Sequence, residues 1–244
     1  MSDIRFLISG DSSLTMELGQ EIDPTVNARV RAAKLLLQQE RIPGVLETVP
    51  TYCALTIHYD PLQISCMALC RRLESLLSRL EQVQLPASNV WVIPVCYGGA
   101  LGPDLKFVAQ HCGMTEEEVI RLHSTPEYLI YMLGFTPGFP YLGGMPSELS
   151  TPRLSEPRVR IPAGSVGIAG GQTGIYPIDS PGGWQLIGRT PVRLYDPARP
   201  SPILLQAGDF LKFHPVLQEE FDAIAASVAN GTYCSPSYQK GGVS

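Results

Sequence analysis

The residues best suited to shape a binding surface lie in the block GFTPGFPYLGG at positions 134–144. Seven of its eleven residues are Gly, Pro or Thr, and three aromatic residues stand between them. Glycine lets the backbone approach another surface closely, and proline holds the path of the chain. Such a loop can present backbone N–H groups, including those around Gly138, together with aromatic rings in a set geometry. A β-barrel turn with structural Gly and Pro explains the composition equally well.

Cationic and small residues follow this block. Arg153, Arg158 and Arg160 each offer a planar fork of donors that suits a carboxylate or a phosphate, although solvated strand ends would explain them as well. The segment IPAGSVGIAGGQTGIYP at 161–177 holds two small-residue loops, and successive N–H groups in glycine turns can form an anion-binding nest. Carboxylates are absent between positions 156 and 179, so the balance favours an anionic ligand.

Other kinds of site are excluded by their missing motifs. The chain has no P-loop, no GxSxG elbow and no HExxH motif. The four histidines are too scattered to predict a metal site, and only His123 is kept as a candidate, because it lies just before the Gly/Pro block. Cys66 and Cys70 stand four apart on a predicted helix, where two small core side chains are a better interpretation than a redox or metal pair.

Composition limits the class of protein. Apolar residues make up 44% and charged residues 17%, which indicates a folded chain. The formal net charge of −5 and the lack of a basic run argue against nucleic-acid binding. With no apolar run long enough for a membrane span and no signal-peptide pattern at the N-terminus, we expect a cytoplasmic protein with reduced thiols.

The first part of the chain alternates strands and helices. Strands are expected at 4–9, 13–18, 45–49, 52–59 and 89–96. One helix is expected from Pro24, with Asp23 as its N-cap, to just before Pro43, and a second through the apolar positions 62–80. This order, roughly ββαββαβ, predicts an α+β fold that begins with a ferredoxin-like α/β sandwich, and we place this N-terminal domain at residues 1–88.

The second part, residues 89–244, has a different pattern. Short helices are expected at 105–112 and from Thr115, where Thr115 and Glu118 form a capping box, towards His123. Short apolar runs separated by Gly and Pro then predict a β-barrel or sandwich, with runs at 129–133, 165–169, 184–187, 192–195, 203–205 and 210–213. A last helix at about 217–228 and a mobile polar tail complete the expectation.

Several motifs carry a resemblance to a known family: GFTPGFPYLGG (134–144), PRVRIPAGSVGIAGGQTGIYP (157–177), SPGGW (180–184), IGRTP (187–191), HYDP (58–61) and PVCYGG (94–99). On these motifs nearly the whole chain resembles the family of the 5-oxoprolinase B subunit, which also includes the kinase inhibitor KipI and part of the carboxyltransferase region of urea carboxylase. The resemblance implies that the second domain is a cyclophilin-like β-barrel. Likeness of fold does not imply prolyl isomerase activity.

The resemblance also implies a function, that of the B subunit of a multi-subunit ATP-dependent 5-oxoprolinase. Such an enzyme converts 5-oxo-L-proline, ATP and water into L-glutamate, ADP and phosphate. The implied partners are a C-type (KipA-like) subunit and an A-type (LamB/YcsF-like) subunit. ATP with Mg belongs to the assembled complex, no cofactor is evident in this chain alone, and the chain is expected to be inactive by itself.

Two alternatives stay open. One is a KipI-like inhibitor of a sensor histidine kinase. The other is a carboxyltransferase-like component acting on a urea-type substrate, although the chain has no recognisable biotin-carrier motif and no carboxylase domain.

Coupling of lactam opening to ATP suggests that the carbonyl oxygen is phosphorylated, so the protein's part would be positioning and charge stabilisation. No catalytic residue and no metal ligand is predicted. The candidate substrate-binding residues are three arginines for a carboxylate or phosphate, three side chains that orient the lactam or water, and two backbone positions that add N–H donors: Arg153, Arg158 and Arg189; His123, Gln172 and Tyr176; Gly138 and Gly171.

Overall fold

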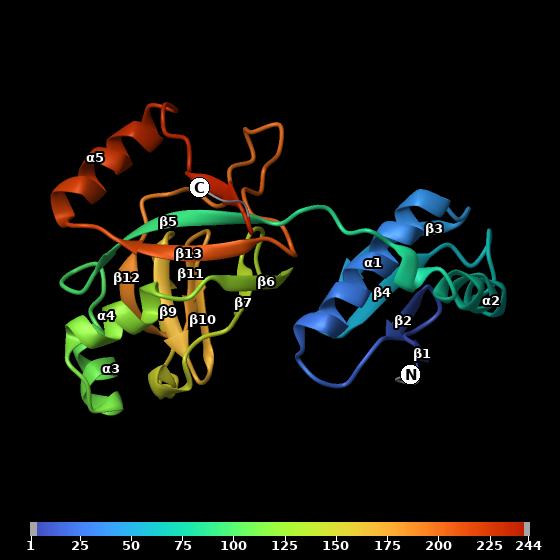
Figure 1. Cartoon of the computed structure of the whole chain (residues 1–244), viewed down its shortest axis with the longest axis horizontal. Helices are drawn as coiled ribbons and strands as arrows, with labels where there is room; N and C mark the ends of the chain where they lie inside the picture. The colour runs from blue at the N-terminus through green and yellow to red at the C-terminus, as the bar shows by residue number, and fades with distance from the viewer. Residues whose placement is uncertain (1–3, 242–244) are drawn as a thin grey trace. The chain divides into compact units, whose positions relative to one another are not determined.

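The computed structural model describes residues 4–241, and the chain divides into two compact units, residues 1–86 and 87–244 (Figure 1). The described part of the first unit consists of β1 (Arg5–Ile8), β2 (Ser13–Glu17), α1 (Pro24–Glu40), β3 (Val45–Pro50), β4 (Ala54–Tyr59), α2 (Cys66–Leu77) and the 3-10 turn η1 (Leu80–Gln82). Its sheet is antiparallel with the order β1-β2-β4-β3. A ferredoxin-like βαββαβ fold whose last strand is moved to the front of the chain has this element and sheet order.

Helix α1 begins where its capping residues predict. The Asp23 carboxylate accepts hydrogen bonds from the backbone N–H groups of Thr25 and Val26 at 2.7 and 3.1 Å, and Pro24 takes the first helical position. The helix ends at Glu40, and Arg41 follows in the left-handed conformation with φ 47°. One face of α1 is buried with the sheet in the apolar core of the unit.

Helix α2 is shorter than the apolar spacing predicts. Its first residue is Cys66, capped by the Ser65 hydroxyl, and Leu62 is 95% exposed. The reason is local, because the Asp60 carboxylate accepts the Leu62 N–H at 2.9 Å and turns the chain before the helix can start.

The expected strand at 89–96 forms, but it belongs to the second unit. As β5 (Asn89–Tyr97) it pairs in parallel with β13 (Phe210–Pro215) and antiparallel with β12 (Gln185–Arg189) and β14 (Ser237–Gln239). Strand β5 is therefore not the last strand of the ββαββαβ order on which the sandwich was predicted, since strands far along the chain take its hydrogen bonds.

The second unit is built on an eight-stranded sheet that is nearly closed into a barrel (Figure 1). The strand path is β10-β9-β12-β5-β13-β6-β7, with β14 on β5. The two ends of this path meet, because a Cβ added at Gly174 on β10 would lie 3.3 Å from the carbonyl oxygen of Pro140 on β7. The remaining elements are α3 (Leu105–Cys112), α4 (Glu116–Ser124), β6 (Tyr128–Leu133), β7 (Pro140–Gly143), the 3-10 turn η2 (Ser147–Leu149), β8 (Arg158–Ile161), β9 (Ser165–Ala169), β10 (Gln172–Ile175), β11 (Ser180–Gly182) and α5 (Gln218–Ala229).

This arrangement confirms the predicted α+β class with a barrel in the second half, and also the helix at 105–112 and the capping box of Thr115 and Glu118. Two predicted strands are wrong. The segments 192–195 and 203–205 meet only in the isolated bridge Tyr195–Ile203. Pro202 lies beside that bridge and has no N–H to extend a ladder.

The segment after α5 also differs from the expectation of a mobile tail. Its residues Ser237–Gln239 form β14 on the edge of β5. The Glu127 carboxylate accepts hydrogen bonds from the Tyr238 hydroxyl at 2.7 Å and from the Lys240 ammonium at 2.5 Å. Paired backbone and a paired charge therefore hold this segment on the barrel.

Candidate functional site

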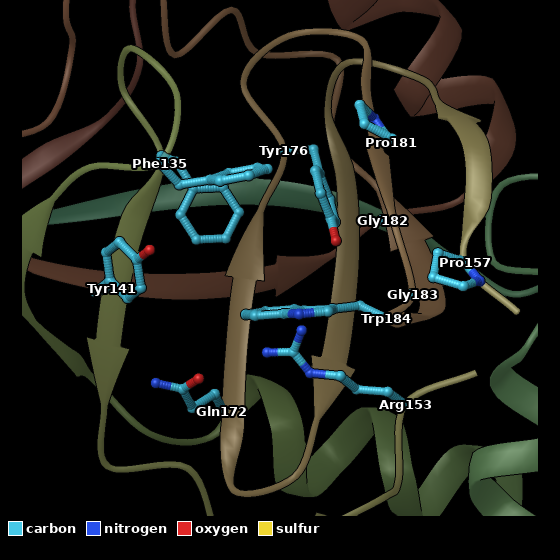
Figure 2. Close-up of a pocket in the computed structure, with 11 residues that line it drawn as sticks. Phe135, Tyr141, Arg153, Pro157, Gln172, Tyr176, Pro181, Gly182, Gly183 and Trp184 are labelled. Carbon is cyan, nitrogen blue, oxygen red and sulfur yellow. The ribbon is translucent and has the colours of Figure 1, made fainter. Parts of the chain in front are cut away.

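An open pocket of about 320 Å³ lies on the second unit, beside β7, β10 and β11 (Figure 2). Its wall brings together residues from three of the motifs singled out in the sequence. The lining residues are Phe135, Phe139, Tyr141, Arg153, Pro157, Gln172, Tyr176, Pro181, Gly182, Gly183 and Trp184.

Phe139 is the centre of the aromatic wall. Its ring is 5.4–5.7 Å, centroid to centroid, from the rings of Phe135, Tyr141, Tyr176 and Trp184, each at an interplanar angle of 65° or more. Edge-to-face pairs of this kind are favourable beyond the area that they bury. Phe139, Tyr176 and Trp184 are also buried in a small apolar cluster, so the floor of the pocket is packed against the protein interior.

Glycine is required where these rings meet the strands. A Cβ at Gly182 would lie 2.5 Å from the Tyr176 hydroxyl, and one at Gly174 would lie 3.2 Å from the rings of both Phe139 and Trp184. The small residues of the 161–177 and 180–184 motifs therefore make room for the aromatic wall.

The loop between β6 and β7 forms the mouth of the pocket. Phe135 has a left-handed backbone with φ 64°, which is uncommon for an aromatic residue, and its side chain is 64% exposed. Gly138 also has a positive φ, 83°, and its backbone lies against Leu194 and Tyr195, outside the set of lining residues. The Gly/Pro composition is thus used both for a turn and for presenting an aromatic ring.

Arg153 reaches the pocket from an extended segment that is anchored on both sides. Before it, Thr151 and Gly170 exchange backbone hydrogen bonds, and after it the Leu154 N–H donates to the Gly183 carbonyl at 2.7 Å. Figure 2 shows its guanidinium beside the Trp184 ring, at the same end of the pocket as Gln172. Among residues 4–241 no carboxylate forms an ion pair with Arg153, so its charge is available to a ligand.

Tyr176 contributes a neutral hydroxyl to the wall. Burial raises the pKa of Tyr176 to about 12, although the charges of Arg153 and Arg158 and a backbone hydrogen bond from Trp184 act in the opposite direction. The phenol is therefore protonated at neutral pH and acts as a hydrogen-bonding group.

Arg158, a candidate for ligand binding, is engaged with the protein itself. Its guanidinium donates to both carboxylate oxygens of Asp104 at 2.8 and 2.9 Å and to the carbonyl oxygen of Trp184 at 3.2 Å. Asp104 also accepts the Leu186 N–H at 2.6 Å. Arg158 thereby joins the start of α3 to the backbone of the pocket wall.

His123 lies in the barrel core, away from the pocket. Its side chain is fully buried and stacks on Phe213 with a centroid distance of 4.3 Å. Nε2 is 2.7 Å from the Thr173 hydroxyl, which donates to the Gly167 carbonyl, so Nε2 carries the proton and Nδ1 accepts from Tyr97 at 2.8 Å. Burial lowers the pKa of His123 to about 3, so the ring is neutral.

The other two candidates lie elsewhere on the barrel. Gly171 is in the turn between β9 and β10, with no heavy atom near the place of its missing Cβ. Arg189, at the end of β12, donates through Nε to the Ala163 carbonyl at 2.8 Å and lines a different cleft. The structure thus brings Arg153, Gln172 and Tyr176 together in one pocket.

The sequence interpretation omitted most of the aromatic wall, since Phe139, Tyr141 and Trp184 were not among the candidates. The signal was present, because the first two lie in the Gly/Pro block and Trp184 ends the SPGGW motif. Within residues 4–241 no group of three or more His, Cys, Asp and Glu side chains is placed to hold a metal ion. No helix in the same range is long and apolar enough to cross a bilayer.

Comparisons with known proteins cover almost the whole chain. A family model described as "Carboxyltransferase domain, subdomain C and D" matches residues 4–205. The 5-oxoprolinase B subunit of Bacillus subtilis (strain 168) is 45% identical over 224 residues, which cover 88% of this chain and 93% of that protein. The protein of the same name from Escherichia coli O157:H7 is 44% identical over 215 residues, covering 88% and 97%. The crystal structure of the K. lactis urea amidolyase matches with a TM-score of 0.79 over 97% of this chain and 16% of that chain; its 20% identity shows likeness of fold alone.

Proposed function

The chain belongs to the family of the 5-oxoprolinase B subunit, and from this premise we propose that it serves as that subunit of an ATP-dependent 5-oxoprolinase whose lactam substrate binds in the aromatic pocket. The reaction opens 5-oxo-L-proline to L-glutamate, with hydrolysis of ATP to ADP and phosphate. The observation that supports this use of the pocket is the guanidinium of Arg153 beside a wall of aromatic rings, with no carboxylate of residues 4–241 paired to it.

The chemistry of the ligand matches that wall. 5-Oxoproline is a flat five-membered lactam with one carboxylate, so it has an apolar ring face and one negative charge. The rings of Phe139 and Trp184 offer apolar surface to the ring, and Arg153 offers a two-donor fork to the carboxylate. Gln172 and the protonated Tyr176 hydroxyl lie on the same wall and supply polar groups for the lactam amide.

The remaining candidates have supporting parts in this proposal. Arg158 holds the Trp184 backbone, and Gly138 shapes the loop that carries Phe135. His123 stays neutral in the barrel core and keeps Thr173, next to Gln172, in place.

ATP with Mg is proposed as a co-substrate of the assembled complex. The residues of the aromatic pocket fit it poorly, because a triphosphate carries several negative charges and Arg153 is the pocket's one cationic lining residue in the described chain. We propose a C-type and an A-type subunit as the partners that complete the reaction, and the cytoplasm as its location. The names of the relatives support the proposal that partner subunits exist, since each relative is named as one subunit of 5-oxoprolinase.

The test is 5-oxoproline-dependent ATP hydrolysis by the complex of this chain with its A-type and C-type partners. We expect activity to require this chain. We also expect Arg153→Gln to raise the KM for 5-oxoproline at least about tenfold, because loss of a hydrogen bond to a charged group usually weakens binding by about that factor. Arg160→Gln is the matched control, because Arg160 is an exposed arginine paired with Asp179. Equal KM values for the two variants would rule out the pocket, and full activity without this chain would rule out the function.

A further inference from the structure

A second cleft, of about 300 Å³, lies on the barrel unit between helix α5 and the loops at the ends of β10 and β12. Helix α5 contributes Phe221 and Ala225, and the barrel contributes Arg189, Arg193 and Pro177. The volume is at the lower end of the range for small-molecule sites. The proposed lactam pocket shares none of these residues.

The cleft is positively charged. Its lining includes Arg189 and Arg193 and no carboxylate. The Arg189 Nε–H donates to the Ala163 carbonyl at 2.8 Å, which orients the guanidinium, and its two terminal nitrogens donate to no residue within 4–241. Arg193 is 57% exposed, and its ion pair with Asp196 is long, at 3.9 Å.

The nearby acid Asp179 is already neutralised. Arg160 donates to its carboxylate through Nε at 2.8 Å, and the Ala163 N–H donates to the other oxygen at 2.8 Å. The single negative charge of Asp179 is therefore shared between Arg160 and Arg189, and the cleft keeps a net attraction for an anion.

An aromatic ring stands opposite the arginines. Helix α5 buries no residue completely, so Phe221 is only half-buried although it faces the barrel. Its ring, with Pro177 and Ala225, forms an apolar wall on which a planar base can stack. Two guanidinium groups on one wall and an aromatic ring on the other match a nucleotide better than a bare anion.

We propose that this cleft binds a nucleotide, with its phosphate groups on Arg189 and Arg193 and its base on Phe221. The proposal goes beyond the lactam pocket, and it stands even if that pocket binds a different carboxylate. It gives the barrel unit two separate sites, one for a small carboxylated ring and one for a phosphate-bearing ligand.

The test is calorimetric titration of the full chain with ADP and, separately, with inorganic phosphate. We expect ADP to bind and to bind more tightly than phosphate, because phosphate has no base to stack. Ala225→Glu introduces a carboxylate into the cleft and should weaken ADP binding about tenfold or more. Ala223→Glu is the matched control, since it makes the same change on the exposed side of the same helix.

A second variant, Arg193→Gln, tests the same site with a change that should not affect folding. Arg193→Gln alters a side chain that is more than half exposed, so the fold is retained while one phosphate contact is removed. It should weaken ADP and phosphate binding by the same factor, about tenfold. Absence of ADP binding, equal affinities for ADP and phosphate, or equal binding of ADP by the Ala225→Glu and Ala223→Glu variants would each overturn the proposal. The KM for 5-oxoproline with Arg153→Gln tests the lactam pocket separately.

Discussion

Replacement of Arg158 by Gln should destabilise the barrel unit strongly, whereas the same change at Arg160, two residues along strand β8, should not. Arg158 makes a two-oxygen contact with Asp104, and the two side chains are 29% and 13% exposed. Arg160 contacts Asp179 with side chains that are 77% and 44% exposed. The two variants therefore compare the same change, Arg to Gln, in a partly buried ion pair and in an exposed one.

The expected loss of unfolding free energy follows from the hydrogen bonds that Arg158→Gln removes. Without Arg158 the Asp104 carboxylate keeps the Leu186 N–H at 2.6 Å but loses its charged partner, and the Trp184 carbonyl loses a donor. Hydrogen bonds to charged groups contribute about 1.5–3 kcal/mol each, and partial exposure reduces that sum. We expect a loss of about 2 kcal/mol, or about 30-fold in the unfolding equilibrium. The exposed Arg160 pair should contribute much less, because water screens it.

Urea unfolding followed by tryptophan fluorescence measures this difference. Trp91 and Trp184 are the only two tryptophans of the chain, and both lie in the second unit, so the signal reports on the barrel. Arg158→Gln should also raise the KM for 5-oxoproline in the complex, because Trp184 shifts, but by less than Arg153→Gln does. Equal unfolding free energies for the two β8 variants would refute the view that Arg158 supports the pocket wall.

Two further predictions concern the barrel core and the pocket wall. The pKa of His123 is about 3 in the folded chain against an ordinary 6.5. The unfolded chain therefore takes up a proton at His123 below pH 6.5 while the folded chain does not, and stability falls as pH falls from 6.5 towards 3, by up to about 1.4 kcal/mol per pH unit. In urea unfolding at several pH values, His123→Gln should flatten this pH dependence, and the exposed His214→Gln should not. Gly182→Ala places a methyl group 2.5 Å from the Tyr176 hydroxyl and should raise the KM for 5-oxoproline several-fold, whereas Gly183→Ala, with 3.7 Å to its nearest neighbour, should have little effect. Equal KM values for the two glycine variants would mean that the position of Tyr176 does not matter for binding.

Local signals in the sequence predicted most helix boundaries. Asp23 and Pro24 start α1, and Thr115 with Glu118 starts α4, because each cap is made within three residues of chain. The start of α2 was missed by four residues, because the apolar spacing said nothing of the turn at Asp60. The alternation of short apolar runs with Gly and Pro was enough to predict a barrel but not to pair its strands.

The roles of the arginines separate in the folded chain for an electrostatic reason. Arg153 and Arg158 are the same residue type within one short segment, and by sequence each suited an anionic ligand. Folding places Asp104, 54 residues away, against Arg158, and no carboxylate of residues 4–241 against Arg153. Only one of the two guanidinium groups is therefore left to bind a ligand in the aromatic pocket.

By itself the sequence determined the class of fold, because capping residues and Gly/Pro spacing act over a few neighbouring residues, and its long motifs carried the resemblance to the family. Only the tertiary structure decided which strands pair with β5, that His123 is a buried neutral ring and that Phe139 is the centre of the aromatic wall. These outcomes depend on contacts between segments far apart in the chain, such as that of His123 with Thr173, 50 residues away. Burial and charge pairing are set by those distant partners, and no local pattern specifies which partners meet.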